Sequence, residues 1–374
     1  MQIIVSEIEQ DEAGQVKGFA RSSFGLDDTR YYYPASTVKL PIAILAHEWL
    51  AEQEVPGLNR ETPMLNLTAR EAQTEARFDS TSANLLPSIA HYAKKILLVS
   101  DNDAYNRLYE LLGQDYINEK LRQKGLAHTV INHRLSIPLP AEENRHVNPI
   151  RFLQADGSTL FELPAREASG VYVNQDAPML AKQYYIGDSL VSAPMDFTTK
   201  NKYALGDFMA TLERLVFPEA FSSEQQFAVA AEDRDFLLTY MGMLPHESQF
   251  PAYDPKEFYP SYSKFFKFGT SKEPIPDQFR LYNKTGMAYG HLLDGGYFVD
   301  EEKGISYFIA AVIYVNENET LNDNSYEYDE VGFPFFAELG EYVYQHFVRR
   351  QETGTFTPYQ RLGTSPWEQA LKKK

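Results

Sequence analysis

Two residues that can act together in nucleophilic catalysis stand three positions apart early in the chain. Ser36 and Lys39 lie in YYYPASTVKLPIAIL, residues 31–45, where an aromatic run gives way to an apolar pattern typical of a helix. A helix places residues i and i+3 on one face, so a neutral lysine amine there can take the proton of the serine hydroxyl. The structural alternative is that Ser36 caps the helix and Lys39 is solvated in its first turn.

The S-x-x-K pattern is weak alone, because Ser261 and Lys264 form a second match. That match lies in a Pro- and Tyr-rich stretch with no helical run after it, and we interpret it as chance. The first match is followed by Ser-Asp-Asn at residues 100–102, at an expected helix start. It is followed again by Lys-Thr-Gly at residues 284–286, inside a strand-like run. The three motifs in this order form a specific composite.

The elements that must position these motifs are indicated by hydrophobic periodicity. A β-hairpin is predicted at the N-terminus, and three further strands are predicted near the C-terminus, at residues 3–10, 16–24, 279–290, 295–302 and 305–315. Helices are predicted at residues 38–50, 88–99, 205–216 and 330–350. Asp101 or Asn102 can cap one more helix, which Gly113 ends. Strands at both ends with helices between them predict an α+β fold, with an antiparallel sheet assembled from both termini.

This sequence resembles the penicillin-recognising serine hydrolases, and class A β-lactamases most closely. The resemblance rests on PAST-V-K at residues 34–39, SDN at 100–102 and KTG at 284–286. It implies a serine β-lactamase/DD-peptidase-like fold, of the α/β sandwich type, with a central helical lobe. The interval between the second and third motifs is longer than is usual in the family. Residues 147–197 and the aromatic loop at 249–269 are therefore the expected insertions.

The domain organisation that follows has two lobes. Residues 1–50 and 270–350 are expected to form one discontinuous α/β domain. Residues 51–269 are expected to form the helical lobe, with the β-rich insertion at about 147–197. Residues 351–374 are expected to form a C-terminal tail.

The resemblance also implies the acylation machinery. Ser36 would be the nucleophile and Lys39 its base, with a pKa lowered from ~10.4 by burial and by the neighbouring Lys284. Ser100 would pass the proton to the leaving nitrogen. The backbone N–H groups of Ser36 and Met287 would form the oxyanion hole, in which one donor is typically worth ~10²–10³ in rate.

The same resemblance implies how substrate is held. Lys284 and Thr285, together with Gly286, would bind a substrate carboxylate, and Asn102 would bind a substrate amide. The structural alternatives are that Asp101 and Asn102 only cap a helix, that Lys284 is a solvated strand residue and that Gly286 marks a β-bulge.

One expected part of a class A enzyme is missing from the sequence. Class A enzymes carry a glutamate in an E-x-x-L-N loop, and this glutamate positions the water that hydrolyses the acyl-enzyme. The corresponding window, HRLSIPLPAEENRHVNP at residues 133–149, has no such motif, and ungapped counting puts the glutamate's place at Leu139. Glu142 or Glu143 could be delivered by a shifted loop, or could belong to a solvated acidic loop. Without a base, the acyl-enzyme should persist.

Composition excludes several other classes of protein. The formal net charge of -17 argues against a nucleic-acid partner. The absence of cysteine excludes disulfides and thiolate metal sites, and the eight histidines show no metal-binding spacing. We find no P-loop, no Rossmann glycine set and no G-x-S-x-G, so we expect no metal and no cofactor. No stretch of the sequence is long and apolar enough to span a membrane.

Three hypotheses for function follow. The first is a β-lactamase-type serine hydrolase that cleaves the amide bond of β-lactams. The second is a D-Ala-D-Ala peptidase or penicillin-binding protein with slow deacylation, and the third is a catalytically weak binding or sensor domain. Because the family's substrates lie outside the inner membrane, we expect a periplasmic or extracytoplasmic protein whose leader has been removed. The oligomeric state does not follow from the sequence.

Overall fold

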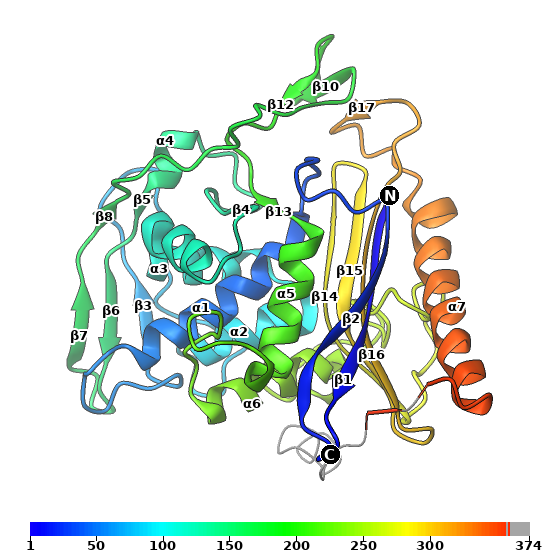
Figure 1. Cartoon of the computed structure of the whole chain (residues 1–374). Coiled ribbons are helices and arrows are strands. Elements are labelled where there is room, and N and C mark those ends of the chain that lie inside the picture. The colour runs from blue at the N-terminus through cyan, green and yellow to red at the C-terminus, as the bar shows by residue number, and fades with distance from the viewer. Residues whose placement is uncertain (357, 360–374) are drawn as a thin grey trace.

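A five-stranded antiparallel sheet drawn from both ends of the chain forms the centre of the fold (Figure 1). The structure is a computed structural model, and it describes residues 1–356, 358 and 359. Most of the expected tail, residues 360–374, lies outside the described residues. The sheet order is β14-β15-β16-β1-β2. The strands are β1 (Gln2–Gln10), β2 (Val16–Phe24), β14 (Phe279–Ala288), β15 (His291–Asp300) and β16 (Ile305–Tyr314).

The pairing of β1 with β16 joins the two ends of the chain, with Ile4 opposite Ala310. This arrangement confirms the predicted α+β fold with a sheet from both termini. Strand β16 is apolar along nearly its whole length because both of its faces are covered. Tyr307 and Ile309 pack in a cluster with α7 (Phe333–Glu352), while Phe308 and Ala310 join the larger core on the other face.

The larger core lies between the sheet and the helices on its other side. Helix α5 (Leu205–Val216) packs on the sheet, and α1 (Lys39–Ala51) crosses the middle of the helical part (Figure 1). Helix α1 is apolar all round because almost every residue in it is buried. The other helices are α2 (Ile89–Val99), α3 (Asn102–Gln123), α4 (Ala141–Arg145) and α6 (Ala231–Gly242). None of the described helices has the length and apolar character needed to traverse a bilayer.

The structure differs from the predicted helices in two places. Gly113 does not end the helix that begins at Asn102: it breaks the helical backbone at φ +76°, but a second helical segment follows at once and runs to Gln123. A glycine tolerates this conformation without strain. Helix α6 was not predicted, because its polar and apolar residues are mixed around the helix instead of forming one stripe.

The predicted insertion at 147–197 is made of short strands and turns. Most of its strands pair locally, as β5 (His146–Val147), β6 (Ile150–Leu153), β7 (Thr159–Leu163), β8 (Arg166–Glu167), β9 (Met179–Leu180), β11 (Ser189–Val191) and β12 (Met195–Asp196) do. Two of its strands also pair outside it: β6 pairs with β3 (Met64–Asn66), and β10 (Gln183–Ile186) pairs in parallel with β17 (Thr320–Leu321). The remaining short strands are β4 (Thr129–Val130) and β13 (Lys202–Tyr203). Residues 249–269 form turns without helix or strand, as predicted.

Candidate active site

The start of α1 brings Ser36 and Lys39 together. Ser36 lies in a short 3-10 turn, Ala35–Val38, and Lys39 is the first residue of α1. The Lys39 Nζ lies 2.9 Å from the Ser36 Oγ. Ser36 makes no cap hydrogen bond to α1, and Lys39 is fully buried. Both halves of the structural alternative for this motif, a capping serine and a solvated lysine, are therefore wrong.

The loop between α2 and α3 supplies a second serine to Lys39. Ser100 ends α2 in a left-handed conformation, with φ +61°. Its hydroxyl lies 3.2 Å from Lys39 Nζ, and its carbonyl accepts a hydrogen bond from the same nitrogen. Asp101 caps α3 by accepting from the Ala104 N–H, which leaves Asn102 free of that task. The Asn102 Oδ1 accepts from Lys39 Nζ at 2.7 Å.

Strand β14 contributes Lys284 from the other side of Ser100. The Lys284 Nζ donates to Ser100 Oγ at 2.7 Å and to the Thr285 carbonyl at 2.9 Å. Lys284 is buried, not solvated. The structure thus assembles Ser36, Lys39, Ser100 and Lys284 into one continuous set of polar contacts, although these residues span most of the chain.

Burial and a neighbouring ammonium group favour the neutral amine on both lysines. The pKa of Lys39 is lowered well below its usual value, first by burial and then by the Lys284 ammonium, while Asp101 acts in the opposite direction. Burial is also the main cause that lowers the pKa of Lys284 to about 7. Asp294 opposes that shift, and Lys264 adds to it.

The free energy of unfolding should therefore rise between pH 7 and pH 9. In the unfolded chain Lys284 has a pKa of ~10.4, so in this window the unfolded state binds more protons than the folded state and stability increases with pH. Lys39 contributes with the same sign. Urea unfolding at several pH values measures the slope. Lys284→Met should reduce it, while Lys17→Met, at an exposed lysine, should not. Equal slopes in all three proteins would contradict the expectation.

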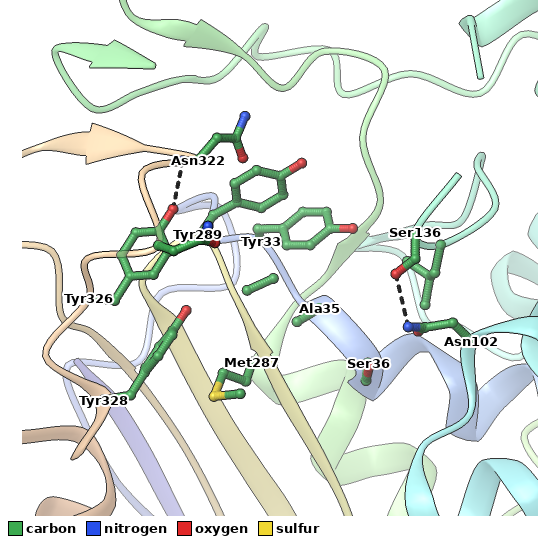
Figure 2. A pocket seen from close by; sticks show the side chains of 13 residues that line it. Tyr33, Ala35, Ser36, Asn102, Ser136, Met287, Tyr289, Asn322, Tyr326 and Tyr328 are labelled. Carbon is green, nitrogen blue, oxygen red and sulfur yellow. Dashed lines mark hydrogen bonds between the residues drawn. The ribbon is translucent and has the colours of Figure 1, made fainter. Parts of the chain in front are cut away.

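A pocket of about 440 Å³ opens above Ser36 (Figure 2). Ser36, Asn102 and Met287 line it. Lys39 and Lys284 lie behind this surface, since both are buried and neither is among the lining residues. A molecule in the pocket would therefore contact Ser36 and Asn102 directly, and both of these side chains contact Lys39.

The turn that carries Ser36 lies against β14 at Gly286. A Cβ atom at position 286 would stand 2.8 Å from the Pro34 carbonyl oxygen and 3.1 Å from the Ser36 nitrogen. Only glycine permits this approach without a shift of one of the two segments. β14 is regularly paired with β15 through this position, so Gly286 does not mark a bulge. Its small size brings the backbone of β14 next to the backbone nitrogen of Ser36.

The backbone of β14 also turns polar groups toward this turn. β14 is an edge strand, and the carbonyls of Leu281 and Thr285 accept from lysine side chains, Lys264 and Lys284. In an antiparallel strand the N–H and C=O of one residue point to the same side, and this side alternates along the strand. By this alternation the Met287 N–H also faces away from β15.

The segment 133–149 presents a serine to the pocket. Ser136 lines it, and its Oγ accepts a hydrogen bond from Asn102 Nδ2 at 2.9 Å (Figure 2). Leu139, the position reached by ungapped counting, does not line the pocket, and neither does Glu142 or Glu143.

Surface ion pairs hold both glutamates elsewhere. Glu143 pairs with Arg70, and Glu142 pairs with Arg145 and His146. The expectation that a shifted loop delivers one of them to Ser36 is not met by this geometry. Sequence reasoning missed Ser136 because it searched the window for an acid.

Lys264 is a second residue that sequence reasoning missed. It is fully buried, and its Nζ donates to the carbonyls of Met241 and Leu281 and to Asn283 Oδ1. Ser261, its apparent partner in the second S-x-x-K, donates instead to a different backbone carbonyl. The match is chance as a catalytic motif, yet Lys264 supports the strand that carries Lys284.

A sequence model described as "Beta-lactamase enzyme family" matches residues 13–347. The chain belongs to the beta-lactamase enzyme family. This membership confirms the resemblance based on the three motifs, and it makes the protein an enzyme of the serine hydrolase type. No curated protein gives a significant sequence match.

Solved structures match this family member over most of its length at low sequence identity. A structure described as PBP-A is 15% identical, with a TM-score of 0.50, over 93% of this chain and 90% of that one. A class A β-lactamase from Mycobacterium abscessus is 15% identical, with a TM-score of 0.49, over 93% and 94%. A β-lactamase from Sphaerobacter thermophilus DSM 20745 is 14% identical, with a TM-score of 0.47, over 96% and 93%.

Proposed function

We propose that this family member forms an acyl-enzyme through Ser36 and deacylates slowly, as a penicillin-binding enzyme does. The observation that carries the first half is the contact of 2.9 Å between Ser36 Oγ and Lys39 Nζ, a lysine whose burial lowers its pKa. The observation that carries the second half is the presence of Ser136, and not of a carboxylate, across the pocket.

Acylation needs a neutral Lys39, and the contacts of its Nζ suit one. Its two N–H groups can donate to the Ser100 carbonyl and to Asn102 Oδ1, and the lone pair is then left for the Ser36 hydroxyl. Ser36 Oγ gives its proton to Lys39 and attacks the amide carbonyl carbon. When the C–N bond breaks, Ser100 gives its proton to the leaving nitrogen and recovers one from the Lys39 ammonium, 3.2 Å away.

β14 and the turn that carries Ser36 would bind the substrate carboxylate and stabilise the developing oxyanion. The backbone N–H groups of Ser36 and Met287 are the proposed oxyanion hole. Lys284, with Thr285 beside it and Gly286 giving access, is the proposed partner of a substrate carboxylate. Its Nζ donates to Ser100 Oγ, and a carboxylate bound beside it would favour its charged form. Asn102 is the proposed partner of a substrate amide. The substrate class is a small amide that bears a carboxylate, either a β-lactam or a peptide that ends in D-Ala-D-Ala.

Deacylation needs a base that activates water, and the pocket offers none. Among the described residues that line it, only tyrosines are ionisable. General-base assistance is typically worth ~10²–10⁴ in rate, so its absence should leave the acyl-enzyme long-lived. This argues for the penicillin-binding hypothesis over rapid β-lactam hydrolysis. Substrates of this class also favour a location outside the cytoplasm.

Intact-mass measurement of the wild-type protein tests the proposal. Incubation with benzylpenicillin should add the mass of one penicillin, and the adduct should persist after free penicillin is removed. An adduct that disappears as soon as penicillin is removed would overturn slow deacylation and support a β-lactamase. No adduct at any time on folded protein would overturn acylation and leave the binding or sensor hypothesis.

A further inference from the structure

The far side of the pocket is a wall of tyrosines and asparagines. Tyr33, Tyr289, Tyr326 and Tyr328 line it together with Asn322 and Asn324. Figure 2 shows Tyr326 and Tyr328 on one side of the pocket and Asn102 and Ser136 on the other. The pocket volume, about 440 Å³, lies within the range of sites that enclose drug-sized ligands. A substrate bonded to Ser36 can therefore extend a bulky group against this wall.

The wall is held in place by hydrogen bonds and ring contacts. The Tyr326 hydroxyl accepts from the Asn322 N–H at 2.9 Å, and the Tyr328 hydroxyl accepts from the Gly290 N–H at 2.8 Å. Tyr289 meets the Tyr33 ring edge-to-face, with centroids 5.0 Å apart. Rings fixed in this way lose little side-chain entropy when they contact a ligand.

Two segments outside the catalytic motifs build this wall. The connection between β16 and α7 carries Tyr326 and Tyr328. The insertion buttresses it, because β10 pairs with β17 and the Tyr185 carbonyl accepts from Asn322 Nδ2 at 3.0 Å. At its other end the insertion supplies Phe197, whose ring packs edge-to-face on Tyr289 at 5.3 Å. The insertion thus acts on the pocket through the residues that it supports.

The chemistry of the wall favours one class of group. Phenol and amide side chains offer ring faces and neutral hydrogen bonds. The described lining residues include no carboxylate, ammonium or guanidinium. A charged group buried there would lose its hydration without gaining a counter-ion, which is costly. An uncharged ring would gain both stacking and apolar burial.

We propose that the tyrosine wall is a subsite for an uncharged, ring-bearing acyl group of the substrate. This rests on the proposed acylation of Ser36. Met287 and Asn102, which would hold the acyl carbonyl and its amide, line the same pocket as the wall. Ser100, which would protonate the leaving nitrogen, lies outside the pocket lining. We therefore assign the wall to the acyl side of the substrate.

Three penicillins that differ only in their acyl group test the subsite. Benzylpenicillin carries a neutral ring in the acyl side chain on its 6-amino group. Carbenicillin carries the same ring and an added carboxylate in that side chain, and 6-aminopenicillanic acid has no acyl side chain on the 6-amino group. Second-order acylation rates from intact-mass time courses should be about tenfold or more higher for benzylpenicillin than for either of the others. Tyr326→Ala should remove most of this advantage and leave acylation by 6-aminopenicillanic acid within about twofold. Tyr326→Phe, which keeps the ring but loses the hydroxyl that accepts from the Asn322 N–H, should keep most of the advantage.

The outcomes separate the subsite from the reaction. Equal rates with all three penicillins would overturn the subsite while acylation of Ser36 stands. Equal loss toward all three compounds in Tyr326→Ala would also overturn it, because the ring would then support only the fold. Acylation by none of the three would mean that the proposed reaction itself fails.

Discussion

Replacing Ser36 by alanine should abolish the penicillin adduct and leave the fold intact. The substitution removes the only proposed attacking atom. The hydroxyl it deletes is half-buried and contacts Lys39, so the loss of stability should be about 1 kcal/mol or less. Intact mass after incubation with benzylpenicillin reports the adduct, and circular dichroism reports the fold.

The second S-x-x-K provides a matched control for that experiment. Ser261→Ala makes the same chemical change in the same motif, at a serine that donates to a backbone carbonyl and contacts no lysine amine in the described structure. This variant should be acylated like the wild type. Retention of the adduct in Ser36→Ala would refute the proposed nucleophile, and its loss in Ser261→Ala would refute the interpretation of the second motif as chance.

Introducing a base at position 136 should convert a stable acyl-enzyme into one that turns over. Ser136 contacts Asn102 and lines the same pocket as Ser36, so we expect a glutamate there to extend its carboxylate into the space next to the acyl-enzyme. General-base activation of water should shorten the adduct half-life by about 10²-fold or more in Ser136→Glu. The backbone at 136 is already left-handed with a non-glycine residue, at φ +57°, so the change adds no new backbone conformation.

The measurement must separate deacylation from acylation, because the new carboxylate would also favour the charged form of Lys39. The adduct is therefore formed first, free penicillin is removed, and the decay of the adduct mass is followed. Ser136→Gln has the same length and hydrogen-bonding reach but cannot act as the base. Equal half-lives in the glutamate and glutamine variants would exclude a missing base as the cause of slow deacylation.

The sequence predicted the arrangement of the strands and helices better than it predicted the residues that line the pocket. The sheet from both termini was predictable because β1 alternates between buried and more exposed residues and β16 is a nearly continuous apolar run, and because helices such as α2 and α5 have clear apolar spacing. The meeting of Ser36, Ser100 and Lys284 was predicted through the three motifs: the first two lie at helix ends and the third lies within β14, and the fold brings these places together.

The rest depended on contacts between segments with no local pattern. Ser136 belongs to a window in which the expected acid is absent, and nothing in its neighbours indicates which side chain faces Asn102. The tyrosine wall joins residues from the connection before α1, from the turn between β14 and β15 and from the segment before α7. Lys264 was set aside because its burial follows from the packing of α6 against β14, and α6 itself has no clear stripe.

The pairing of β1 with β16 has a consequence for biosynthesis. While the ribosome makes the chain, the N-terminal hairpin has no neighbour on its inner edge until residues 305–314 have emerged. At ~5–20 residues per second this takes on the order of 15–60 s, during which a two-stranded hairpin alone is marginal. The nascent polypeptide therefore cannot complete its central sheet, on which Lys284 and Ser36 depend for their positions, before it is almost fully made.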